Sequence, residues 1–303
     1  TRFALGTLSG ASASASGPDV SLEDAPLVDR WILTRLHRTV HTVEDAIAGY
    51  RFSALADALY DFAWRDYCDW YLEAVKPTVS KDPRQCQVLL SMTDALLRLL
   101  HPVMPFVSET LWPHVSACGP RGLDGLILAD SEVLATASWP DIACRVDDAD
   151  ADERFGQVQA LVSEIRTLRG ERNVNPRRSI KLFLPPGAAA LVEEAGGVVE
   201  VLCGAGELAP SSEAPDDAVA IAFQGEEVLL GGLMDGAERD KERSRLEKVC
   251  EQKRKQVGGF EGRLGNPNYV QKAKPELVEE TRRLLEQAKA DLEAAEAALA
   301  RLG

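Results

Sequence analysis

Apolar residues recur at about the helical period between residues 26 and 114, which predicts four helices joined by short connections. The first ends near Gly49 and the second stops at Pro77. The third runs from about residue 85 to residue 100, and the fourth begins at His101 and Pro102. Four helices with such short links predict a bundle. The apolar positions of the first two helices are Leu27, Trp31, Leu36, Val40, Val43 and Ile47, then Leu55, Leu59, Phe62, Trp64, Tyr71 and Val75.

The middle of the chain changes period twice. Residues 117–147 contain glycine, proline and the dipeptide Trp139-Pro140, and they are expected to be irregular. Helical spacing returns over residues 148–169. Short apolar runs at 180–184 and 218–223 predict strands, with residues 228–230 as a candidate third strand. A small α/β unit is therefore expected after the bundle.

Residues 237–262 and 275–302 contain almost only Glu, Lys, Arg, Ala, Gln and Leu, apart from the pair Gly258-Gly259. Between them lies the turn-forming run Gly265-Asn266-Pro267-Asn268. This pattern predicts an antiparallel coiled-coil hairpin with arms of about 40 Å each. The predicted fold is thus mainly α, with a helical bundle (20–145), a small α/β subdomain (146–235) and a C-terminal arm (236–303).

The net charge of −14 is difficult to reconcile with nucleic-acid binding through bulk charge, so any such binding must use local basic patches. No apolar run approaches the roughly 20 residues of a membrane span, and no membrane association is expected. The six cysteines form no Cys-x-x-Cys pair, which argues against a zinc ribbon or a small disulfide scaffold. Reduced thiols in a cytoplasmic protein are expected.

Several local motifs stand out along the chain. They are Cys68-Asp69-Trp70-Tyr71-Leu72-Glu73, Lys76-Pro77, Leu99-Leu100-His101-Pro102-Val103-Met104-Pro105-Phe106, Glu109-Thr110-Leu111-Trp112, Ser138-Trp139-Pro140, the run from Ile165-Arg166 to Pro176, Leu264-Gly265-Asn266 and Ala273-Lys274-Pro275. Together with the predicted hairpin, these motifs resemble those of valyl-tRNA synthetase, and the resemblance covers essentially the whole chain. The bundle motifs are shared with the isoleucyl and leucyl relatives, whereas the predicted hairpin is typical of the valyl family. Isoleucyl enzymes tend to end in a cysteine-rich zinc module, which the cysteine spacing of this chain cannot form.

The resemblance implies a role in joining valine to tRNA-Val at the expense of ATP. The family's His-x-Gly-His and Lys-Met-Ser-Lys-Ser signatures are missing, so no catalytic residue and no cofactor site are expected, and the chain alone should be inactive. The ATP site would belong to a missing catalytic domain, from which residues 1–19 are interpreted as a truncated linker. The expected partners are tRNA-Val and the catalytic and editing domains, in a cytoplasmic monomer.

By the same resemblance, Leu72 and Glu73 face the anticodon bases and Phe3 stacks on one of them. A carboxylate accepts hydrogen bonds from a base amino group, and base–aromatic stacking contributes about 1–3 kcal/mol. The alternatives are that Phe3 is an exposed terminal residue and that Trp70 and Tyr71 only pack the bundle. A lysine that helps to read the anticodon in the family precedes the first residue of this chain.

The family's arm leans on the outer corner of the tRNA, which assigns corner contacts to Lys253, Arg254, Lys255 and Arg263. The alternative is a solvated coiled-coil face with acid–base pairs four residues apart. A rival function is therefore a coiled-coil interaction protein without RNA binding, which the net charge and the glycines of the arm favour. A second basic patch contains Arg166, Arg169, Arg172, Arg177 and Arg178. Two alternatives are open for this patch: it faces the tRNA backbone, or it only solvates the surface of the small subdomain.

The histidines are expected to be structural or solvent-exposed. His37 and His41 lie four residues apart on one helical face, but no third ligand is evident, so no metal site is predicted. Both are expected to face solvent. His101 is interpreted as ending the preceding helix.

Overall fold

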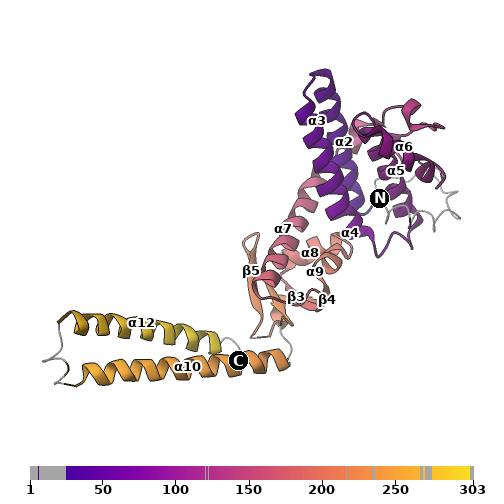
Figure 1. The fold of residues 1–303 in the computed structure, drawn as a ribbon. Coiled ribbons are helices and arrows are strands. Elements are labelled where there is room, and N and C mark those ends of the chain that lie inside the picture. The colour runs from indigo at the N-terminus through magenta and orange to yellow at the C-terminus, as the bar shows by residue number, and fades with distance from the viewer. Residues whose placement is uncertain are drawn as a thin grey trace.

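The computed structural model shows a helical body and a two-helix arm that projects from it (Figure 1). The mainly α prediction is confirmed. The described residues are 6, 25–119, 121, 123–215, 217–233, 236–266, 269 and 275–300.

The bundle contains the four predicted helical regions. The second is a continuous helical run whose centre, η1, has π-type hydrogen bonding. The fourth prediction was wrong at its start, because α6 begins at Pro105 rather than at residue 101. Residues 101–104 instead close α5, since the backbone N–H groups of Val103 and Met104 both donate to Leu100. Pro105 fits the first helical position, where no N–H is needed. The bounds are α2 (Leu27–Ala48), α3 (Phe52–Tyr60), η1 (Asp61–Tyr71), α4 (Leu72–Val75), α5 (Pro83–Leu100) and α6 (Pro105–Ser116).

The irregular segment after α6 is attached to α5 through the buried side chain of Arg98. Its only strands within the described residues are β1 (Leu126–Ile127) and β2 (Asp141–Ile142), which pair antiparallel. The Arg98 guanidinium donates to the carbonyls of Ala129 and Ser138, both at 2.8 Å. It also forms a buried ion pair with Asp94. These contacts attach a segment that has little regular hydrogen bonding of its own to α5.

The α/β unit is a four-stranded sheet in the order β4-β3-β6-β5, preceded by α7 (Ala149–Glu171). The three predicted strands are confirmed as β3 (Ile180–Leu184), β5 (Val219–Phe223) and β6 (Glu226–Gly231). Strand β4 (Ala205–Pro210), an edge strand parallel to β3, was not predicted. Nor were the helices α8 (Pro186–Glu194) and α9 (Val198–Cys203), which form the crossover that such a parallel pair requires.

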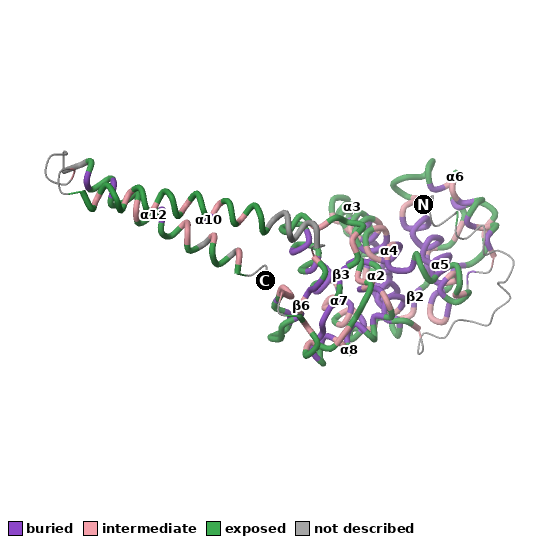
Figure 2. The backbone as a smooth tube through the Cα atoms, turned by 90° about the horizontal axis from the view of Figure 1, so that it is seen from below, coloured by how far each residue is buried: buried purple, intermediate pink, exposed green. Residues whose placement is uncertain are grey.

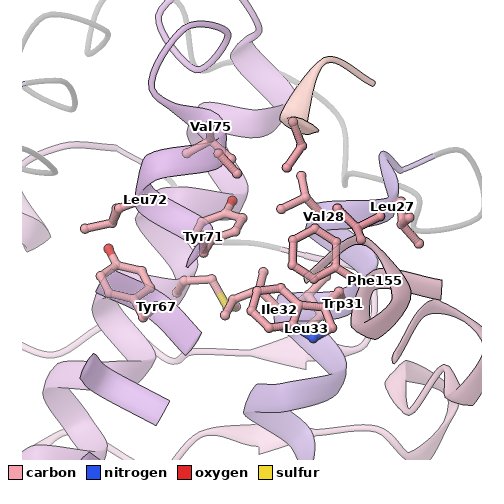
Figure 3. Packing of buried hydrophobic residues seen from close by; sticks show 14 of the residues in the cluster. Leu27, Val28, Trp31, Ile32, Leu33, Tyr67, Tyr71, Leu72, Val75 and Phe155 are labelled. Carbon is pink, nitrogen blue, oxygen red and sulfur yellow. The ribbon is translucent and has the colours of Figure 1, made fainter. Parts of the chain in front are cut away.

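One continuous apolar core joins the bundle to the α/β unit. Trp31 of α2 stacks on Phe155 of α7 with ring centroids 4.2 Å apart, and Figure 3 shows both among the packed core residues. Both rings of the stacked pair are buried. The packing of α7 on α2 therefore crosses the proposed boundary at residue 145, which stays a prediction.

The arm consists of α10 (Gly236–Leu264) and α12 (Pro275–Ala300), which lie side by side and antiparallel, as predicted (Figure 1). Most of its described surface is exposed, in contrast to the body (Figure 2). The buried positions are Cys250, Val278, Thr281 and Ala288. No helix within the described residues combines the length and apolar character of a membrane span.

Candidate nucleic-acid interface

In the motif from residue 68 to residue 73, the side chains of Tyr71 and Leu72 face the core. Tyr71 is fully buried and donates a hydrogen bond from its hydroxyl to Asp29 Oδ1 at 2.9 Å. Leu72 is 6% exposed and belongs to the core (Figure 3). Glu73 is half-buried and forms an ion pair with Lys76. Of the two expected base contacts on this helix, Glu73 is therefore the more accessible.

Trp70 links this helix to α7. Its ring meets Phe155 edge-on at 6.3 Å, and the guanidinium of Arg166 lies 5.6 Å from its centroid. The packing interpretation of Trp70 is thus supported, although the ring remains half-buried. Phe3 lies outside the described residues, so its position relative to Glu73 stays a prediction.

Asp29 is a buried carboxyl with no cationic partner among the described residues. Burial raises the pKa of Asp29 from its ordinary 3.8 to about 7, although hydrogen bonds from Tyr71 and Gln85 oppose this rise. Apart from its apolar neighbours Val28 and Trp31, nothing in the sequence around Asp29 indicates this burial.

The arm's basic cluster is already matched by carboxylates. Lys253 Nζ lies 2.6 Å from Asp291 and Arg254 Nη2 lies 2.6 Å from Glu296, both across the helical pair. Lys255 pairs with Glu251 on its own helix, as the coiled-coil alternative expects. The contact with Glu296 raises the pKa of Arg254.

Arg263 differs from the other three predicted corner contacts. It is exposed near the end of α10. The described part of the chain offers it no ion-pair partner. The charge of Arg263 is thus the most available of the four.

The histidine prediction was half wrong. His41 is exposed, but His37 is only 7% exposed, because that side of α2 faces the bundle. Their Nε2 atoms are 3.1 Å apart. Burial, and then the neighbouring His41, lower the pKa of His37. Within the described residues, no three His, Cys, Asp or Glu side chains are grouped to hold a metal ion.

Trp64 was placed in the apolar helical pattern but is 56% exposed. Trp64 lies two residues after buried Phe62, which is about 200° around a helix, so the two side chains point to different faces. The ring of Trp64 stacks instead on exposed Tyr60, at 6.5 Å.

The second basic patch is brought together around the C-terminal end of α7. Arg169 is buried and donates to the carbonyls of Cys203, Asn175 and Arg178, among others. Arg166 donates from Nε to the carbonyl of Leu202 at 3.1 Å. The residues after α7 thus fold around one guanidinium.

The sequence matches two protein families. Residues 29–184, more than half of the chain, match the family described as the anticodon-binding domain of tRNA ligase. Residues 239–303 match the valyl tRNA synthetase tRNA binding arm. The two matches lie in the body and in the arm, respectively.

Curated relatives carry the name valine–tRNA ligase. That of Thermotoga maritima is 35% identical over 273 residues, covering 88% of this chain and 30% of the relative. That of Nocardia farcinica is 33% identical over 308 residues, covering 100% of this chain and 32% of the relative. The chain therefore spans about a third of the length of the relatives that it matches. It belongs to the valyl-tRNA synthetase family, of which it carries the anticodon-binding domain and the tRNA-binding arm.

Proposed function

We propose that this chain holds tRNA-Val at two separate places, the anticodon and the outer corner. The main support for this proposal is that one chain matches an anticodon-binding domain over residues 29–184 and a tRNA-binding arm over residues 239–303. The arm projects from the body, so the two surfaces are well separated (Figure 1). In the parent enzyme, such a grip would present the acceptor end to a catalytic domain that joins valine to tRNA with ATP.

At the anticodon, Glu73 accepts hydrogen bonds from a base, Leu72 offers apolar surface beside it, and Phe3 stacks on a second base. Glu73 is the residue on which this proposal chiefly depends, because Leu72 is nearly buried. The ion pair with Lys76 holds the Glu73 carboxylate at the surface. One of its oxygens can accept from a base while the other keeps the lysine.

At the corner, Lys253, Arg254, Lys255 and Arg263 contact phosphates. The first three share their charge with Asp291, Glu296 and Glu251. Arg263 has no carboxylate partner among the described residues to give up when it binds a phosphate, so it is expected to contribute most to RNA affinity. Phosphate contacts of this kind fix the register, whereas the base contacts give specificity.

The remaining organisation follows from the same proposal. Residues 1–19 would join the chain to the catalytic domain, and the three functional units would be 20–145, 146–235 and 236–303. The chain itself would bind no cofactor, because ATP would belong to the catalytic domain. The parent enzyme would act in the cytoplasm as a monomer.

Filter binding tests this proposal with a tRNA-Val transcript and the same transcript carrying a substituted anticodon. We expect the wild-type chain to prefer the first, and Glu73→Gln to reduce that preference. Arg263→Gln should weaken both RNAs equally, since a phosphate contact carries no sequence information. Glu213→Gln, an exposed carboxylate of the α/β unit, is the matched control.

Two outcomes contradict the proposal. They are a lack of tRNA binding at low salt, and binding that is indifferent to the anticodon. The first would favour the coiled-coil interaction protein, whose arm cations serve only to join the two helices. A separate assay for valyl-adenylate should give no product from this chain, and its detection would contradict the assignment of catalysis to another domain.

A further inference from the structure

A cavity of about 590 Å³ opens where α7 ends and the chain turns back toward the sheet. Its walls come from the end of α7, from the following residues 173–176 and from the end of α9. Arg166, Arg169, Asn173 and Asn175 supply the polar side chains. The chemistry of this cavity is set by the two arginines, since none of its lining residues is acidic.

Arg169 is a buried cation whose guanidinium is satisfied by backbone carbonyls, including those of Asn175 and Arg178 at 3.0 Å. No carboxylate among the described residues forms an ion pair with it. Carbonyl dipoles and the C-terminal end of α7 stabilise this charge. These groups carry no net charge of their own, so the guanidinium remains a positive charge beside the cavity.

Arg166 is exposed beside the cavity, and two contacts hold its side chain: one with the ring of Trp70 and one hydrogen bond to a backbone carbonyl. The Nε group donates to Leu202, and the guanidinium lies over Trp70. Its terminal nitrogens make no ion pair within the described residues. Glu200, on the adjoining helix α9, forms no ion pair with Arg166 or Arg169 within the described residues.

Arg172 and Arg177 extend the positive charge along the loop that surrounds Arg169. Both are exposed. Neither has a carboxylate partner among the described residues. In a chain of net charge −14, these arginines lie together without a carboxylate partner in the described part of the chain, whereas the arm cations Lys253 and Arg254 are each paired.

We infer that this cavity and the exposed loop beside it bind the phosphodiester backbone of RNA. Arg166 at the cavity and Arg172 and Arg177 on the loop are the contacting residues, and Arg169 is the positioning residue that shapes the loop. Guanidinium groups suit phosphate because they present several N–H donors in one plane. Trp70 connects the cavity to Glu73, three residues further along the same helical run. The identity of the RNA as tRNA-Val rests on the proposed function.

The test compares two triple variants in filter binding of the tRNA-Val transcript at several salt concentrations. One is Arg166→Gln/Arg172→Gln/Arg177→Gln. The control, with the same change in charge, is Arg145→Gln/Arg154→Gln/Lys181→Gln, whose cations are each paired with a carboxylate. We expect the first to weaken binding about tenfold at moderate salt and to lower the salt slope by about 2, and the control to change both little.

Arg169 is left intact so that the loop keeps its shape, and thermal unfolding checks that each variant folds. A measurement on the wild-type chain needs no variant at all. Hydrogen exchange should show protection of residues 169–178 when the transcript is added.

The outcomes separate this inference from the proposed function. Equal binding and equal salt slopes for both triple variants, or no protection of residues 169–178, overturn the cavity as an RNA site. Binding that ignores the anticodon but still falls in the first variant contradicts the proposed function and retains the cavity. Failure of the wild-type chain to bind the transcript at low salt overturns both.

Discussion

The body and the arm of this chain are stabilised by different forces. In the body, a continuous apolar core extends from α2 through the sheet. In the arm, only a few side chains are buried, and the two helices are joined by ion pairs such as Lys253–Asp291 and Lys289–Glu261. The body is therefore expected to resist salt and local opening, whereas the arm is expected to yield to both.

The same contrast applies to the cations of the two regions. In the arm, three of the four predicted corner contacts already have carboxylate partners. Around α7, Arg169 has only carbonyl partners, and Arg166 and Arg172 have no acid among the described residues. The basic cluster of the arm is thus largely neutralised by its own neighbours, whereas these three arginines around the end of α7 are not, within the described part of the chain.

The largest expected effect is on the body. Phe155→Ala removes the ring that stacks on Trp31 and should lower the free energy of unfolding by about 3–5 kcal/mol. Urea denaturation followed by tryptophan fluorescence measures it. Phe106→Ala is the control, since that ring is 88% exposed. If hydrogen-exchange protection fell in α12 as much as in the body, the arm would depend on the same core. That result would contradict the difference between the forces that stabilise the body and the arm.

The second effect concerns pH. Because the pKa of Asp29 is about 7 when folded and 3.8 ordinarily, the folded state holds the proton more tightly. Stability should therefore fall as the pH rises from about 4 to about 7. Asp29→Asn should raise the free energy of unfolding by about 2–4 kcal/mol at pH 8 and by little at pH 4.

Denaturant unfolding at both pH values, with Asp45→Asn as an exposed control, measures this difference. A gain that is the same at pH 4 and pH 8 would contradict the role of ionisation. The arm, which buries no carboxyl among its described residues, should contribute nothing to this dependence.

A smaller effect is expected in the arm. Gly258 and Gly259 lie inside α10, and a methyl group at either would meet nothing within 4 Å. The double change to alanine should stabilise the helix by about 2 kcal/mol, since each glycine costs up to about 1 kcal/mol. Hydrogen exchange of α10 measures it. In the body, Gly204→Ala should instead destabilise, because Gly204 has a φ of 66°.

The smallest effect tests the ion pairs. Lys253→Gln breaks the contact with Asp291 and should loosen the arm by about 0.5 kcal/mol at low salt, and by less at 1 M salt. Arg282→Gln, whose partner Glu279 lies on the same helix, is the control. Exchange rates in α10 and α12 at both salt concentrations measure it. A loss that does not decline with salt would mean that Lys253 acts through packing.

The long helices and their order could be predicted, those of the bundle and α7 from their apolar period and those of the arm from their composition and the turn between them. The two arm helices and α7 were predicted to within a few residues. Strand β4 could not be, because Ala205–Pro210 has no alternating apolar pattern and is held by backbone pairing at the sheet edge. The burial of His37 depends on tertiary packing, whereas the exposure of Trp64 follows from its spacing of two residues from buried Phe62.

The candidate site was less predictable than the fold. The sequence identified the basic residues of the arm and of α7, but not their partners. Glu296 lies 42 residues from Arg254, and only the register of the two helices brings them together. Likewise, nothing in the spacing of Arg169 indicates that it alone of the α7 arginines is enclosed by carbonyls.

The enclosure of Arg169 has a consequence for sequence divergence. Its planar guanidinium reaches carbonyls of Asn175, Arg178 and Cys203 at once, from two parts of the chain. A lysine carries one ammonium group and could not span these acceptors. Substitution at this position would therefore be tolerated only if the loop after α7 were rebuilt with it. The loop and its arginines are expected to be inherited, or lost, as one unit.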